Sequence, residues 1–144
     1  MLVASVRILL VEDFEPWRRS VRSTLKDHGE LRLVDEVGDG LEAVRRACEL
    51  KPDLILLDIG IPSLNGIEAA RRIRQAMPDI KIIFLSQIND CDVVQAALNT
   101  GAHGYVLKSQ AGRELLPAVA AVLRGDQFVG SGLASSSGSS RPLN

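Results

Sequence analysis

The chain has 144 residues, a length that suits one domain, and 46% of them are hydrophobic, which is enough for a sizeable core. Its 17 basic and 18 acidic residues give a net charge of −1, which argues against a nucleic-acid-binding or membrane-surface domain. Aromatic residues make up only 3%, so a platform for stacking bases is not expected either.

The cellular compartment is predicted from features that would mark export or a membrane. The first residues, MLVASVRILLVED, lack a charged region before the apolar run and end it with Glu12 and Asp13, so they indicate a strand and not a signal peptide. No apolar run approaches the roughly 20 residues of a membrane span. Cys48 and Cys91 have no CxxC spacing, which excludes a zinc motif and a disulfide framework. We therefore expect a cytoplasmic protein.

Five apolar runs alternate with five helical patterns along the chain. The apolar runs, each typical of a buried strand, cover residues 6–12, 31–38, 53–58, 81–86 and 104–108. The helical patterns begin near Pro16, Leu41, Gly66, Asp90 and Ala111, and they end near His28, Lys51, Met77, Gly101 and Leu123. This alternation predicts an α/β fold with five helices covering both faces of a five-stranded parallel sheet. Fold statistics favour the doubly wound, flavodoxin-like strand order 2-1-3-4-5.

The end of the chain differs in composition from the rest. Residues 131–144 contain six serines and two glycines, which is typical of a flexible segment. We expect a folded domain over residues 1–128 and a flexible tail over residues 129–144.

Polar side chains stand at the carboxyl ends of four predicted strands. Glu12 and Asp13 end the first strand, Asp58 the third, Ser86 the fourth and Lys108 the fifth. Ligands of open parallel sheets bind at this edge, so we expect these side chains to converge on one crevice. Each residue alone has a simpler interpretation, such as a helix cap, a loop charge or a solvated lysine. Their joint placement predicts a functional site.

The chemistry of this crevice favours a divalent cation and a phosphoryl group. Three neighbouring carboxylates repel one another, and a hard cation such as Mg²⁺ relieves that repulsion while keeping several of its waters. Lys108 supplies a positive charge and Ser86 a hydroxyl for phosphoryl oxygens.

The motifs LLVED, LILLDIGIPSLNG (54–66), IIFLS (82–86) and GYVLK (104–108) resemble the receiver domain of bacterial two-component response regulators. The resemblance covers residues 6 to about 125. It implies that Asp58 accepts a phosphoryl group from a sensor histidine kinase with Mg²⁺ as cofactor, and that the protein is not an enzyme apart from slow self-dephosphorylation. The implied metal ligands are Glu12, Asp13, Asp58 and the carbonyl of Gly60; Lys108 and Ser86 assist transfer, and Ser86 and Tyr105 form the switch.

Residues 101–125 resemble most the LuxR-type subfamily, whose members usually carry a C-terminal DNA-binding domain. The resemblance implies the regulatory part of a transcription regulator that contacts DNA only through such a domain, which this sequence lacks. A stand-alone receiver is the alternative.

Apolar residues on the last helix suggest a homodimer through the face of helix 4, strand 5 and helix 5, although a wide core face explains them equally well. Gln87, where relatives usually have a small residue, is expected to narrow access to Asp58.

Two other functions fit the pattern less well. An aspartate-nucleophile phosphatase needs a second aspartate two positions after the first, where this chain has Gly60. A flavodoxin-like mononucleotide binder needs a phosphate loop rich in Ser, Thr and Gly after the first strand, where this chain has the acidic EDFEPW. Gly60 and Ile88 offer no side-chain hydrogen bond to an attacking water, so slow phosphate loss is expected.

Overall fold

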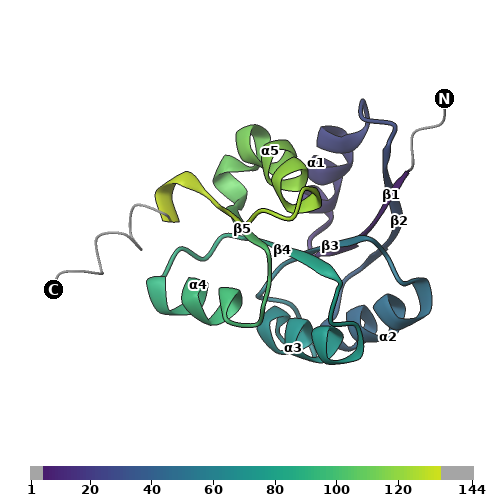
Figure 1. Ribbon diagram of the computed structural model, residues 1–144, viewed down its shortest axis with the longest axis vertical. Helices are drawn as coiled ribbons and strands as arrows, with labels where there is room; N and C mark the ends of the chain where they lie inside the picture. Colours follow the sequence, from purple (N-terminus) through teal and green to yellow (C-terminus); the bar gives the residue numbers. More distant parts are fainter. Residues whose placement is uncertain (1–4, 134–144) are drawn as a thin grey trace, which may run out of the picture.

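Six parallel strands form one sheet in the order β2-β1-β3-β4-β5-β6 in the computed structural model, which describes residues 5–133 (Figure 1). The strands are β1 (Val6–Val11), β2 (Leu31–Val37), β3 (Leu54–Leu57), β4 (Lys81–Ser86), β5 (Gly104–Leu107) and β6 (Phe128–Val129). The predicted order of the first five strands is confirmed, and their bounds agree with the predicted ones to within one residue. The sixth strand adds two residues at the edge beside β5.

Five α-helices connect the strands and cover both faces of the sheet. They are α1 (Glu15–Leu25), α2 (Gly40–Leu50), α3 (Gly66–Ala76), α4 (Cys91–Leu98) and α5 (Ala111–Leu123), with a short 3₁₀ turn, η1 (Lys108–Gln110), before α5. Helices α1 and α5 lie on one face and α2, α3 and α4 on the other (Figure 1). Asp39, Asn65 and Asp90 begin α2, α3 and α4 by accepting hydrogen bonds from backbone N–H groups of the first turn.

The central strands are hydrophobic at every position because both of their faces are covered. In β1, Ile8 and Leu10 join the core beneath α1 and α5, whereas Leu9 and Val11 join the core beneath α2, α3 and α4. All four are at most 2% exposed. This two-sided burial explains the unbroken apolar runs that predict the strands.

The wide apolar stripe of α5 is part of the core. Leu115, Val119 and Val122 are buried, and Leu116 and Leu123 pack partly buried against the same cluster. Core packing therefore accounts for the stripe that suggested a dimer contact.

The chain continues to pack on the sheet beyond α5. The predicted tail starts at residue 129, which the structure places in β6, and Leu133 is only 3% exposed. Residues 134–144 of that tail lie outside the described residues. None of the described helices has the length and apolarity needed to cross a bilayer.

Candidate functional site

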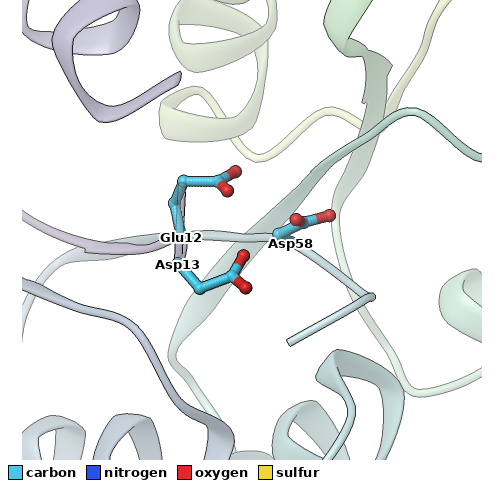
Figure 2. A group of neighbouring side chains, drawn as sticks. All are labelled: Glu12, Asp13 and Asp58. Atoms are coloured by element: carbon cyan, nitrogen blue, oxygen red, sulfur yellow. The ribbon is translucent and has the colours of Figure 1, made fainter. Parts of the chain in front are cut away.

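The predicted site residues meet at the carboxyl edge of the sheet. The parallel registers pair Val11 with Leu57, Leu57 with Phe84, and Ser86 with Leu107, so β1, β3, β4 and β5 all end at this edge. Carboxylate oxygens of Glu12, Asp13 and Asp58 lie within 4.8 Å of one another. Figure 2 shows the three carboxylates turned toward a common space.

Burial distinguishes this edge from the rest of the molecule. Within residues 5–133, the buried polar or charged side chains are Glu12, Asp58, Ser86 and Lys108, and all four belong to the predicted site. Burying a charge is costly unless a partner compensates it. The buried charged residues of the described part thus lie together, which marks this edge as a candidate functional site.

Lys108 compensates two of the buried carboxylates. Its Nζ lies 2.6 Å from Oε1 of Glu12 and donates to Oδ2 of Asp58 at 3.0 Å. The remaining oxygens are satisfied by the backbone: the Phe14 N–H donates to Glu12 at 3.0 Å, and the Ile59 N–H donates to Asp58 Oδ1 at 2.7 Å. The network fixes the direction of both carboxylates.

The charges of the pocket fit a divalent cation. Three carboxylates and one ammonium leave a formal charge of −2. Burial raises the pKa of Glu12, and the nearby Asp58 charge adds to this, although hydrogen bonds from Lys108 and Phe14 oppose it. Oxygen donors of this kind, with Asp13 exposed to solvent, suit Mg²⁺, which keeps several waters. Glu12, Asp13 and Asp58 would hold the ion.

A hollow of about 230 Å³ opens directly onto these groups. Its lining residues are Glu12, Asp13, Phe14, Trp17, Asp58, Gly60, Gln87 and Lys108. Gly60, predicted to supply a carbonyl ligand, and Gln87, expected to narrow access to Asp58, both line this hollow. The loop after β3 is drawn tightly against Asp58, because an added Cβ at Gly66 would lie 2.0 Å from the Asp58 carbonyl oxygen. Only glycine fits there.

The two predicted switch residues are joined through the backbone of Ile88. The Ile88 N–H donates to Oγ of Ser86 at 3.2 Å, and the Tyr105 hydroxyl donates to the Ile88 carbonyl at 2.6 Å. Ser86 and Tyr105 are 1% and 0% exposed. Burial raises the pKa of Tyr105, so its hydroxyl stays a donor. A displacement of Ser86 would therefore reach Tyr105 through one residue.

Sequence reasoning missed two contributors to this arrangement. The linking role of Ile88 belongs to its backbone, which any residue has, and no sequence signal could have found it. Trp17 in the first turn of α1 places its ring 5.0 Å from the Lys108 ammonium. A tryptophan four residues after Asp13 is a visible signal, since the start of α1 has to face the same edge as Asp13.

A doubly wound sheet with this acidic pocket and lysine defines a receiver of two-component signalling, and comparison with known proteins agrees. The sequence profile of the response regulator receiver domain matches residues 8–120. The chain belongs to this family, whose members are generally phosphoacceptors and not enzymes.

Similar proteins include regulators of the LuxR family. The response regulator protein VraR of Staphylococcus aureus is 34% identical over 122 residues, which are 85% of this chain and 58% of that protein. The crystal structure of a LuxR-family two-component response regulator from Aurantimonas sp. SI85-9A1 superposes with a TM-score of 0.90 at 31% identity. It covers 94% of this chain and 97% of that one.

RcsB of Salmonella typhimurium supports the fold alone. It superposes with a TM-score of 0.88 at 22% identity, over 94% of this chain and 68% of that one. The chain spans 58% of the length of VraR, so what the whole relatives do is a separate question from what this domain does.

Proposed function

We propose that this receiver takes a phosphoryl group onto Asp58 from a phosphohistidine of a sensor histidine kinase. The observation that carries the proposal is the concentration of buried charge. Asp58 lies at the mouth of the pocket with its side chain 10% exposed, and Lys108 contacts it from within. A structural ion pair would need no opening, whereas a nucleophile needs one.

The phosphoryl transfer is a single displacement at phosphorus. One carboxylate oxygen of Asp58 forms a bond to phosphorus while the P–N bond of the phosphohistidine breaks, and the electron pair of that bond stays on the imidazole nitrogen. Bound Mg²⁺ would supply neutralisation of the charge on the transferring oxygens. Lys108, 3.0 Å from Oδ2 of Asp58, needs only a small displacement to reach an oxygen of the new acyl phosphate.

The switch follows from the hydrogen bonds of Ile88. A phosphoryl group on Asp58 brings three strong acceptors and a charge of about −1.5 to −2 next to the Ser86 hydroxyl. Ser86 then turns its hydroxyl toward the phosphoryl group and weakens its contact with the Ile88 N–H. The Ile88 segment is released to move, together with the hydroxyl of Tyr105 that it holds. Phosphorylation thus shifts the population of two arrangements of this face.

The output is proposed from the relatives. We infer that the chain is the regulatory receiver of a LuxR-type transcription regulator and that it meets DNA only through a C-terminal domain outside this sequence. RcsB, which shares the fold at 22% identity, has been solved as dimers bound to DNA, and a homodimer of this chain is proposed by analogy with it. A homodimer through α4, β5 and α5 would have to accommodate β6, which occupies the outer edge of β5. A stand-alone receiver acting through protein contacts is the alternative output.

The experiment uses acetyl phosphate as a small phosphodonor together with Mg²⁺. The proposal expects labelling that hydroxylamine removes, that reaches one phosphoryl group per chain, disappears in Asp58→Asn and persists in Asp53→Asn, a matched change at the opposite edge of the sheet. Rapid release of many equivalents of phosphate without accumulation of labelled chain would instead identify a phosphatase. Labelling that survives in Asp58→Asn would refute the assignment of the acceptor.

A further inference from the structure

The last described residues form a strap, defined as residues 128–133, along the edge of the sheet. Figure 1 shows it, in yellow, beyond β5 and between α5 and α4. Val129 pairs with Tyr105, and the N–H of Gly130 donates to the Tyr105 carbonyl at 2.9 Å. The strap lies beyond the family match, which ends at residue 120. It is attached to the same residue that the proposed switch moves.

The strap is held by one buried side chain. Leu133 is 3% exposed and belongs to the cluster that contains Tyr105, with Val94 and Ala97 from α4. Its N–H donates to the carbonyl of Gly130 at 3.0 Å, which closes a turn and directs the side chain inward. Leu133 therefore belongs to the same core as Tyr105 and as α4, the helix that follows the Ile88 segment.

Where the strap meets α5, only one of the two carboxylate oxygens of Glu114 has a hydrogen-bond partner. Oε2 of Glu114 accepts from the Ser131 N–H at 3.3 Å, whereas Oε1 is buried without a hydrogen-bond partner. An added Cβ at Gly130 would lie 2.9 Å from that oxygen, so the strap itself covers it. An unsatisfied carboxylate oxygen is costly, and it would be hydrated if the strap left. Apolar burial of Leu133 thus opposes desolvation of Glu114, which makes the seated strap easy to shift.

A continuous series of contacts joins the pocket to the strap. It runs from Ser86 through the backbone of Ile88 to the hydroxyl of Tyr105, and from the carbonyl of Tyr105 to Gly130, whose own carbonyl accepts from the N–H of Leu133. Spatial continuity alone does not make coupling; it requires an element with two states that both ends favour differently.

We propose that the strap is a regulatory device whose seating is linked to the state of the Asp58 pocket. The inference rests on the proposed function. Drawing Ser86 toward a phosphoryl group displaces Ile88 and the start of α4, which loosens the seat of Leu133. The strap is seated when the pocket is empty and released when it is filled. By linkage, a strap that cannot seat favours the filled pocket.

The test uses the whole 144-residue chain and Mg²⁺ with beryllium trifluoride, a stable mimic of the phosphoryl group. Leu133→Ala weakens the seat. Gly132→Ala is the matched control within the strap, because its added Cβ meets nothing closer than 3.8 Å. Leu25→Ala, in the core beneath α1, controls for general loss of stability. Affinity for the mimic is measured by titration, and amide exchange of Gly130 is followed by NMR.

Two results are expected. Leu133→Ala binds the mimic about fivefold more tightly than the wild type, at the lower end of typical coupling, while both controls bind as the wild type does. In the wild type, the mimic accelerates exchange of the Gly130 amide while leaving that of Ile55 in β3 unchanged.

Other results overturn the strap proposal. If Leu133→Ala binds the mimic less than about threefold more tightly than the wild type, or more weakly, the strap and the pocket are not linked. Unchanged or slower exchange of Gly130 in the wild type does so without any variant. If the wild type binds neither Mg²⁺ nor the mimic, the proposed function fails and the strap proposal falls with it. Normal binding with an unresponsive strap rejects the strap alone.

Discussion

Replacing Lys108 by methionine tests how the pocket balances its charge. The substitution keeps the length of the side chain and removes the ammonium that lies 2.6 Å from Glu12 and 3.0 Å from Asp58. All three side chains are at most 10% exposed, so solvent screens them poorly. Two buried carboxylates then face each other without a cation.

The expected loss of folding stability follows from the two ion pairs of Lys108. At an effective dielectric constant of about 20, each ion pair provides roughly 6 kcal/mol of gross attraction. Desolvation of the charged groups cancels most of this, but removing one partner leaves the others buried and unpaired, which costs about 3–5 kcal/mol. With a slope of about 2 kcal/mol per molar, the urea midpoint should fall by roughly 2 M.

Urea unfolding without and with Mg²⁺ measures the stability lost with the ammonium and the stability that the cation restores. Without metal, Lys108→Met should be far less stable than Lys26→Met, a control at an exposed position. Added Mg²⁺ should stabilise the variant more than the wild type, because three carboxylates without the lysine bind a cation more tightly; a cation at a hundred times its dissociation constant contributes about 2.7 kcal/mol. Equal stability of the two variants without metal, or equal stabilisation of the variant and the wild type by Mg²⁺, would refute the reasoning.

Three further predictions concern other parts of the molecule. Gly60→Asn should lose phosphate from Asp58 several-fold faster, because open space around Gly60 admits an amide that can hold a water; equal decay rates would remove the idea. Trp17→Leu should lower the free energy of unfolding by about 1 kcal/mol through loss of the contact with Lys108, and Trp17→Phe by less. Equal losses would assign Trp17 a packing role only. Burial and neighbouring positive charges lower the pKa of His103 below its usual 6.5. As the pH falls, the unfolded chain therefore binds a proton at this residue before the folded chain does. The free energy of unfolding should then fall as the pH drops below about 6.5. His103→Gln should flatten that fall in urea titrations between pH 8 and pH 5, and an unchanged profile would contradict the assignment.

The sequence predicts the central sheet well because its physics is local. Strands buried on both faces must be apolar throughout, as β1 and β3 are, and the end of each run marks the edge where ligands bind. The proximity of Asp58 and Lys108 could therefore be predicted although they are 50 positions apart in the sequence. The strand order came from fold statistics and from no residue of this chain.

Other features depend on contacts that carry no sequence pattern. Strand β6 has two residues, too few for any periodicity, and a composition rich in serine and glycine hides it. The apolar stripe of α5 looked wide enough for a second partner because a helix packed between a sheet and α1 has to bury more than one row. The hydrogen bonds of Ile88 involve its backbone alone.

The central claim is that one carboxylate, that of Asp58, becomes an acyl phosphate. Borohydride reduces an aspartyl phosphate to homoserine, so treatment of the labelled protein followed by peptide mass spectrometry identifies the acceptor residue. The account predicts homoserine at position 58 and at no other aspartate. Homoserine at position 13, or a label that resists reduction altogether, would contradict it.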